Sequence, residues 1–260
     1  MKTPKGTLRN IFGFTLIELL VVMAVISILL AVIFPAISKA KSRCRLLKCQ
    51  SNLRQIGMAW DMYLIDFGEF LQGTNMQRYF GGISQGVGDL RPLNEYLKGN
   101  VNAGSSGRKS VFYCPGDTTR NNLRPKVFFD GDGTSYQANE YLVGQELQSG
   151  RSTLIDGLKK KIQSGLPRAA VSTNPASLLF MGDTHWRTEW TPIEAVVGAA
   201  WHDKPSFYNI SFLDGHVGFV NIRKGIYISA NYSLIPFKEL NGLARSEQEA
   251  WEEWQPPQRR

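Results

Sequence analysis

GFTLIELLVVMAVISILLAVIFPAISKAK, residues 13–41, is almost entirely apolar and decides the fold of this chain. Within residues 14–37 the apolar run is interrupted only by Thr15, Glu18, Ser27 and Pro35. As an α-helix, residues 14–37 would extend about 36 Å at ~1.5 Å per residue, which is enough to cross a hydrocarbon core of about 30 Å. Leu, Val and Ile occupy every face of this helix, so we expect a membrane span and not an amphipathic helix.

A secretory signal peptide is the alternative explanation for this apolar run. Signal peptides have a shorter apolar core, followed by a small-residue cleavage site. Here the core is longer, and the stretch SKAKSRCRLLKCQSNLRQ after it continues as a helix without a break. We therefore expect the apolar run to stay on the mature protein.

The charges that flank the span favour a cytoplasmic location for the larger part of the chain. This is opposite to the periplasmic or extracellular location that we expect for the globular domain. Three basic residues precede Gly13, and six follow the span: Lys39, Lys41, Arg43, Arg45, Lys48 and Arg54. Because positive charge normally stays on the cytoplasmic side, charge counting alone would place the larger part of the chain in the cytoplasm.

Glu18 needs a functional explanation, because a carboxylate inside a bilayer costs a few kcal/mol. If the chain were cut between Gly13 and Phe14, the new α-amino group of Phe14 would lie one helical turn from Glu18. The carboxylate would also lie in the first turn, where the helix dipole favours negative charge. Glu18 could pair with its own amino terminus, or with that of a neighbouring subunit and so set the axial stagger. The alternative is a charge tolerated near the interface.

The whole segment resembles the N-terminal signal of type IV pilins and type II secretion pseudopilins. That pattern is a short basic leader, a Gly, a Phe and a Glu at the fifth mature position, here Gly13, Phe14 and Glu18. Pro35 matches the helix-kinking proline that such proteins often carry. The resemblance implies that a prepilin peptidase cuts after Gly13 and methylates the amino group of Phe14.

An apolar stripe of helical period follows the span. Its members are Leu46, Cys49, Leu53, Ile56, Trp60, Tyr63 and Phe67, spaced alternately by three and four residues. This spacing predicts one helix from about Phe14 to about Asp66, bent at Pro35, whose second half packs on a globular domain. A coiled coil is the alternative for the stripe, but it would span barely three heptads.

The remaining sequence predicts an antiparallel sheet with long loops. FYNISFLDGHVGFVNI is a hairpin with a two-residue Asp214-Gly215 turn, and ASLLFMGDTHW contains a buried strand. Two further strands are predicted, one in SVFYCPGD that ends at Cys114 and one after the turn that FFDGDG predicts. PLNEYL predicts a short helix, and SEQEAWEEW predicts a terminal helix. The fold class is therefore α+β: a leader over 1–13, a span over 14–37, a helical stem over 38–67 and a globular domain over 68–260.

Charge and cysteine content limit the possible partners of the chain and the number of disulfides it can form. The net charge is +8, but three of the basic residues lie before Gly13, so no nucleic acid partner is expected. Three cysteines are too few for a disulfide scaffold. Cys49 and Cys114 could form one bridge in an oxidising compartment, with three buried thiols as the alternative, and Cys44 lies off the apolar stripe.

A second resemblance concerns the globular part. CQSNLRQIGMAW, FYCPGD, SYQANEYL and the stretch from His202 to Asp214-Gly215 are similar to a pilin-related group common in planctomycetes and their relatives. Members of that group end in a His, a nine-residue spacer and Asp-Gly. Here the spacer between His202 and Asp214 is longer, at eleven residues, and the middle of the chain is only patchily similar.

Two groups of residues are candidate metal ligands. His185, His202 and His216, together with Asp183 and Asp214, have donor atoms suited to a divalent metal such as Zn²⁺, with Asp183 and His185 on one face if that segment is extended. Asp130 and Asp132 could bind Ca²⁺, although no Glu closes an EF-hand loop. Structural alternatives are a turn for Asp214, a plain turn for Asp130 and Asp132, and an ordinary hairpin position for His216. The sequence contains no nucleophile elbow, P-loop or dinucleotide fingerprint.

These observations predict a pilin-like structural subunit and not an enzyme. We expect it to be anchored in the cytoplasmic membrane by a single span, in contact with lipid, with its globular domain in the periplasm or outside the cell. Its expected partners are a prepilin peptidase, an inner-membrane assembly platform and other pilin-like subunits, in a homo- or hetero-polymer. A monomeric membrane-tethered binding protein for a glycan or secreted substrate and a membrane-anchored metal enzyme are the alternatives.

Overall fold

The structure is a computed structural model that describes residues 15–72, 76–83, 91–97, 110–117, 128–143, 166–189, 201–202 and 204–243. The chain forms two compact units, divided between Arg43 and Cys44, and each is described by itself. The predicted leader, the Gly13–Phe14 bond and the predicted terminal helix lie outside the described residues.

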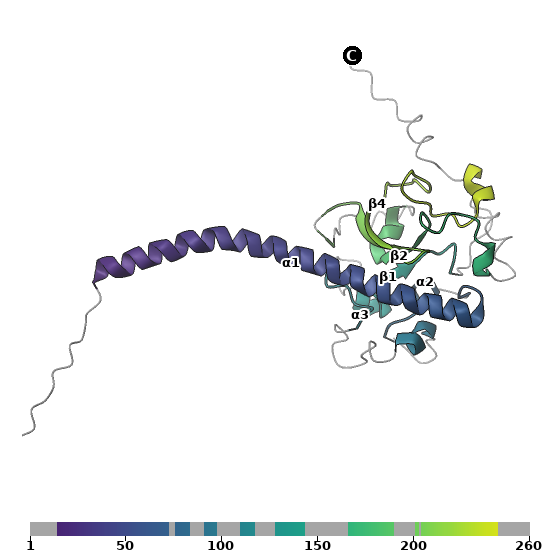
Figure 1. Cartoon of the computed structure of the whole chain (residues 1–260), viewed down its shortest axis with the longest axis horizontal. Coiled ribbons are helices and arrows are strands. Elements are labelled where there is room, and N and C mark those ends of the chain that lie inside the picture. The colour runs from purple at the N-terminus through teal and green to yellow at the C-terminus, as the bar shows by residue number, and fades with distance from the viewer. Residues whose placement is uncertain are drawn as a thin grey trace, which may run out of the picture. The chain divides into compact units, whose positions relative to one another are not determined.

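The first helix, α1, runs without interruption from Leu16 to Phe67 and continues through Pro35 (Figure 1). This agrees with the single long helix that the sequence predicts. Within the first unit, every side chain from Thr15 to Lys41 is exposed. The helix is long and apolar enough to cross a membrane, and none of its most apolar window is buried. The chain therefore fits a single-pass, membrane-anchored protein.

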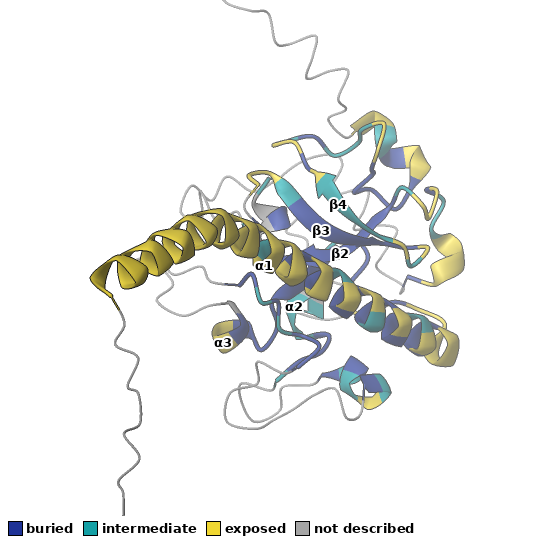
Figure 2. Ribbon diagram, turned by 60° about the vertical axis from the view of Figure 1, so that its left-hand side comes forward, coloured by how far each residue is buried: buried dark blue, intermediate teal, exposed yellow. Residues whose placement is uncertain are grey.

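Within the second unit, α1 buries the predicted apolar stripe on one side (Figure 2). Leu46, Cys49, Leu53, Ile56, Trp60 and Tyr63 belong to the hydrophobic core. Phe67 does not, because 63% of its surface is exposed; its ring stacks on Tyr63 with centroids 4.6 Å apart. The prediction was therefore wrong for this last member, which lies at the point where the helix ends.

A four-stranded antiparallel sheet lies behind this half of α1 (Figures 1 and 2). Its strands are β1 (Tyr136–Ala138), β2 (Leu179–Asp183), β3 (Phe207–Phe212) and β4 (Val217–Asn221), in the order β1-β2-β3-β4. Long helix and sheet together confirm the α+β class.

The hairpin between β3 and β4 forms where the sequence predicts it, but its turn is longer. The amide of Phe212 donates to the carbonyl of His216 and the amide of Gly215 donates to the carbonyl of Phe212, so three residues connect the paired positions. Gly215 has φ +90°, a left-handed conformation that closes three-residue hairpins. The predicted two-residue turn was therefore wrong by one position.

Short helices complete the described fold. They are α2 (Met76–Tyr79), η1 (Pro92–Leu97), α3 (Phe128–Asp132), η2 (Arg168–Ala170), η3 (Thr184–Glu189) and η5 (Lys238–Leu243). Two predictions are corrected here. The stretch SVFYCPGD forms consecutive turns and not a strand, and FFDGD forms α3 and not a turn.

Aromatic side chains fill the interface between α1 and the sheet. The ring of Trp60 is 5.3 Å from that of Phe180 on β2 and 5.8 Å from that of Phe80, and all three side chains are buried. Burying each such side chain contributes roughly 1.5–3 kcal/mol, so this contact fixes the second half of α1 on its domain.

Gly57 faces β3 from the second half of α1, and replacing it with alanine is expected to stabilise the fold. A Cβ atom at this position would meet Ser211 Oγ at 3.5 Å, an ordinary van der Waals distance. Because glycine is about 1 kcal/mol less favourable than alanine inside a helix, Gly57→Ala should raise the free energy of unfolding by up to ~1 kcal/mol. Chemical denaturation of both proteins measures this; a lower stability of the variant would show that the helix cannot tolerate a methyl group against β3.

Candidate functional site

The N-terminal candidate site lies in the first turn of α1. The carboxylate of Glu18 accepts hydrogen bonds from the amide nitrogen of Thr15 at 2.8 Å and from its hydroxyl at 2.7 Å. In return, the amide of Glu18 donates to the hydroxyl of Thr15 at 3.3 Å. This reciprocal arrangement is a capping box, which satisfies backbone groups that a helix start leaves open. Glu18 therefore has a structural partner within its own chain.

The role of Thr15 was missed in the sequence, although the pattern that indicates it is present. Thr-Leu-Ile-Glu directly before an apolar run has the spacing of a capping box. The position of Glu18 instead suggested a pairing with the amino group of Phe14, which lies outside the described residues. The capping box and the predicted contact with the amine do not exclude each other. A carboxylate has about four acceptor positions, so Glu18 can accept hydrogen bonds from Thr15 and from an amino group at the same time.

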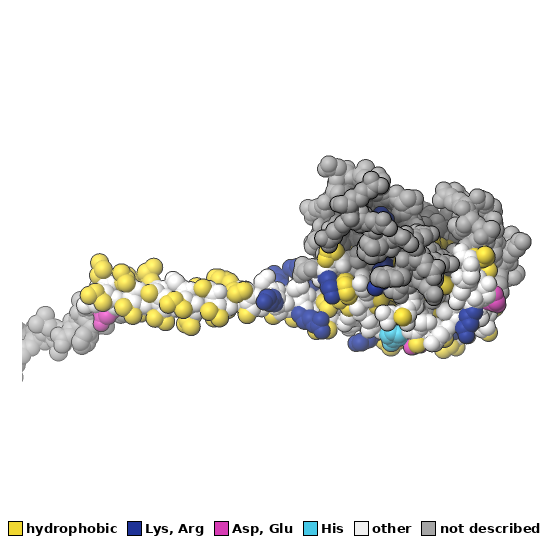
Figure 3. Space-filling model, turned by 90° about the horizontal axis from the view of Figure 1, so that it is seen from above, with side chains coloured by type: hydrophobic (Ala, Val, Ile, Leu, Met, Phe, Trp, Pro, Cys, Tyr) yellow, Lys and Arg dark blue, Asp and Glu magenta, His cyan; other side chains and the backbone are white. Residues whose placement is uncertain are grey.

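Farther along the apolar part of α1, the polar side chain of Ser27 has a hydrogen-bond partner within the helix. The hydroxyl of Ser27 donates to the carbonyl of Met23 at 2.7 Å, as is required of a polar side chain in lipid. Over the described residues 15–43 of the first unit, Figure 3 shows mostly apolar side chains, and the basic side chains of this range, Lys39, Lys41 and Arg43, lie at its end. The first unit thus has the composition of a membrane span with a basic border.

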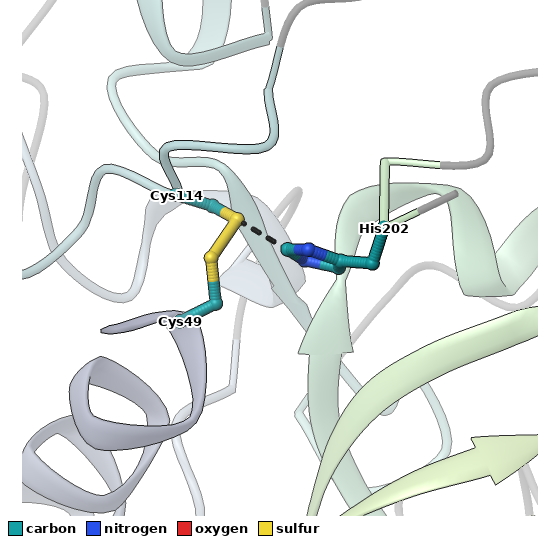
Figure 4. Close-up of side chains that lie close together, drawn as sticks. All are labelled: Cys49, Cys114 and His202. Atoms are coloured by element: carbon teal, nitrogen blue, oxygen red, sulfur yellow. Dashed lines mark hydrogen bonds between the residues drawn. A yellow bond between two sulfur atoms is a disulfide. The ribbon is translucent and has the colours of Figure 1, made fainter. Parts of the chain in front are cut away.

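A second candidate site is buried inside the globular unit, around a disulfide. Cys49 on α1 is bonded to Cys114, which lies 65 residues farther along the chain, and both side chains are fully buried (Figure 4). The third cysteine, Cys44, is exposed and is a free thiol. The bond joins the stem helix to the turn Cys114-Pro115-Gly116-Asp117, so it ties two distant segments together.

His202 lies directly against this disulfide. Its Nε2 atom is 3.5 Å from Cys114 Sγ, and only 2% of its side chain is exposed (Figure 4). The imidazole reaches the sulfur because Gly116 has no side chain: a Cβ atom there would lie 2.8 Å from His202 Cε1 and 2.8 Å from the carbonyl oxygen of Trp201. Glycine at position 116 thus makes room for the histidine.

Asp183, at the end of β2, completes the cluster. Its Oδ2 atom lies 3.5 Å from His202 Nε2 and accepts hydrogen bonds from the backbone amide and the side-chain amide of Asn209, at 2.9 and 3.2 Å. Its Oδ1 atom has no hydrogen-bond partner among the residues that the structure describes. The pKa of Asp183 is raised to about 7, mainly because the carboxyl is buried. The hydrogen bonds from Asn209 lower this pKa, and the negative charge of Asp117 raises it further.

This buried carboxyl should make the stability of the protein fall as the pH rises. Below a pH of about 7 the folded protein holds a proton on Asp183, whereas the unfolded chain releases it near the ordinary value of 3.8. The folded state therefore binds more protons between about pH 4 and pH 7, so the contribution of Asp183 to the free energy of unfolding decreases over this range and is constant above it.

Denaturation of the wild type and of Asp183→Asn at pH 5 and pH 8 tests this expectation. The stability of the wild type minus that of the variant should be smaller at pH 8 than at pH 5. His202, Asn209, Asp117 and Tyr136 interact with this carboxyl. Because His202 Nε2 lies 3.5 Å from Asp183 Oδ2, the comparison is repeated with His202→Gln in both proteins. A difference that does not change with pH would contradict the raised pKa.

The structure separates the predicted metal ligands. Asp183 and His202 lie together, but His185 follows β2 in the helix η3, so the expected shared strand face with Asp183 is wrong. Asp214 and His216 form an exposed pair at the β3–β4 hairpin, with Oδ1 and Nδ1 2.6 Å apart, and the His216 ring stacks on Phe212.

The other predicted ligands, Asp130 and Asp132, belong to the short helix α3. Asp130 is exposed, and Oδ2 of Asp132 lies 4.0 Å from an Arg78 guanidinium nitrogen. Among the described residues, the group of three potential metal ligands is instead Cys49, Cys114 and His202. No spacing in the sequence points to this group, because its members come from three segments far apart in the chain.

Comparison with known proteins gives one match. Residues 8–34 match the family model of the prokaryotic N-terminal methylation motif, a stretch that contains Gly13, Phe14 and Glu18. The match supports a precursor of the type IV pilin-like kind. No curated protein matches the chain, and no solved structure does.

Proposed function

We propose that this chain is a structural subunit of a pseudopilus or a type IV pilus-like fibre, with no catalytic activity of its own. The observation that carries the proposal is the methylation motif at residues 8–34, together with the exposure of every side chain from Thr15 to Lys41, a range in which α1 begins at Leu16. Apolar surface of this extent needs a non-aqueous partner, which is lipid before assembly and other helices afterwards.

Processing creates the group that drives assembly. A prepilin peptidase cuts between Gly13 and Phe14 and methylates the new amino group, which is cationic. In the fibre this cation pairs with Glu18 of a neighbouring helix, while the Thr15–Glu18 capping box holds the carboxylate in place. An ion pair inside an apolar core has few alternative partners, so it fixes the axial position of each subunit.

The disulfide supports an oxidising location for the globular unit. Bonds such as Cys49–Cys114 persist in the periplasm or outside the cell and are rare in the cytoplasm. An oxidising location is opposite to the one that the charge count around the span favours, which is a cytoplasmic domain. Assembly from the inner membrane through a platform protein is consistent with a periplasmic domain, and so is a role in secretion or surface attachment.

Cross-linking through the span distinguishes a fibre from a monomeric binding protein. Val25 is about half exposed on the first unit, and Cys44 is the free thiol. In a Cys44→Ser chain, Val25→Cys should give an oxidised dimer in membranes of the native host, because each chain then offers one free thiol. Cys44→Ser alone is the matched control and should give none. A Val25→Cys chain that stays monomeric would favour the tethered binding protein.

A further inference from the structure

The buried cysteine–histidine cluster has the spacing of a metal site. The ligand atoms of Cys49, Cys114 and His202 all lie within 4.8 Å of one another. In a tetrahedral zinc site, with Zn–S near 2.3 Å and Zn–N near 2.0 Å, a sulfur and a nitrogen ligand are about 3.5 Å apart. The observed distance between Cys114 Sγ and His202 Nε2 is 3.5 Å. The histidine is thus already placed as it would be around zinc.

The surroundings of Cys114 also suit a thiolate. The backbone amide of Gly116 donates to Cys114 Sγ at 3.4 Å, and the amide of Asp117 donates to the carbonyl of Cys114 at 2.9 Å, which closes the turn. An N–H group directed at sulfur stabilises negative charge on it, as the outer partners of metal ligands do. A disulfide sulfur carries no such charge, so this hydrogen bond is worth more in the reduced protein.

Asp183 lies beside His202 and offers a further donor, whereas the group whose ligand atoms lie within 4.8 Å of one another is Cys49, Cys114 and His202. Asp183 is 1% exposed, its Oδ2 atom lies 3.5 Å from His202 Nε2, and its Oδ1 atom has no hydrogen-bond partner within the described parts of the chain. A buried carboxylate oxygen without a partner is costly, and coordination of a cation removes that cost. Two sulfurs, one imidazole nitrogen and one carboxylate oxygen are ligands that zinc accepts.

We propose that the dithiol form of this protein binds one Zn²⁺ ion through Cys49, Cys114 and His202, with Asp183 in the fourth position. The disulfide and the zinc site exclude each other, because both use the same two sulfurs. Zinc would link α1 to the turn at Cys114 in the chain before it is oxidised, and the disulfide makes the same link afterwards.

The disulfide form is converted to the zinc form by a balanced reaction. A phosphine reductant supplies two electrons that break the S–S bond; one water molecule provides the oxygen of the phosphine oxide and the two protons of the thiols. Zn²⁺ then replaces both thiol protons, which pass to water, and leaves two thiolates on the metal. Because both cysteines are fully buried, the dithiol chain is best obtained without prior oxidation.

The test uses the full chain, made in a reducing cytoplasm and purified in detergent under anaerobic conditions with a phosphine. Zinc per chain is measured by elemental mass spectrometry, and the same protein loaded with Co²⁺ is examined by absorption. We expect one zinc ion per dithiol chain, none in the oxidised chain, and Co²⁺ bands of a tetrahedral site with thiolate charge transfer.

Variants identify the ligands. His202→Gln should weaken zinc binding at least ~10-fold, whereas Cys44→Ser, which removes the exposed thiol, should leave it unchanged. The Co²⁺ spectrum of His202→Gln should also lose its tetrahedral form, which a loss of stability alone would not produce in a chain that still binds cobalt. A dithiol chain that binds no more zinc than the oxidised chain, folded or not, would overturn the proposal. Zinc binding that depends on Cys44 and not on His202 would overturn it as well.

Discussion

Replacing Glu18 with alanine is expected to leave the chain in the membrane and to remove it from the fibre. The span keeps its apolar residues, and loss of a charge makes insertion easier. Assembly, in contrast, loses the partner of the Phe14 amino group, which would then be a buried cation without a counter-ion. A charged hydrogen bond contributes roughly 1.5–3 kcal/mol, so the fraction of subunits in the fibre should fall by at least ~10-fold.

The measurement is the ratio of this chain in sheared fibres to this chain in membranes, in its native host. Two further variants separate charge from helix capping. Glu18→Gln keeps the shape and an acceptor for Thr15 but removes the charge, and should fail as the alanine variant does; Thr15→Ser keeps the box and should assemble. Normal incorporation of Glu18→Ala would show that the carboxylate does not set the register.

Removing the disulfide should cost the globular unit about 4 kcal/mol. The bond closes a loop of 65 residues, and chain-entropy models give a stabilisation of roughly 3–5 kcal/mol for loops of this order. The effect is a large fraction of the total stability of a typical domain, which is roughly 5–15 kcal/mol. Thermal or chemical unfolding of the oxidised wild type and of a Cys49→Ala, Cys114→Ala double variant measures it.

Cys44→Ser is the matched control for this experiment, because Cys44 is an exposed free thiol and should contribute almost nothing. Metal is removed with a chelator, so that the comparison concerns only the S–S bond. If the double variant unfolds at the same denaturant concentration as the wild type, the bond does not secure α1 to its domain.

The regular elements could be predicted because local patterns determine them. An apolar run with a helical stripe after it specifies α1, and two apolar runs around Asp214-Gly215 specify the β3–β4 hairpin. The errors lie where local patterns compete with tertiary contacts. Phe67 has the helical spacing but is the last residue of α1 and stays exposed, and FFDGD contains turn residues yet forms α3.

The two candidate sites also differ in whether local sequence or tertiary contacts bring their residues together. Gly13, Phe14 and Glu18 are neighbours in the sequence, so their relationship is visible in one short motif. His202 meets Cys114 across 88 residues, through a gap that Gly116 leaves, and no local spacing records that contact. The cysteine pair was one of two alternatives in the sequence, and its contact with histidine required the fold.

The mass of the mature amino-terminal peptide tests the central claim most directly. The protein is isolated from its native host, digested, and its first peptide sequenced by mass spectrometry. The account predicts a chain that begins at Phe14 and carries an extra methyl group on its α-amino nitrogen. A native chain that still carries residues 1–13 would contradict it, because Glu18 would then have no terminal amine to pair with.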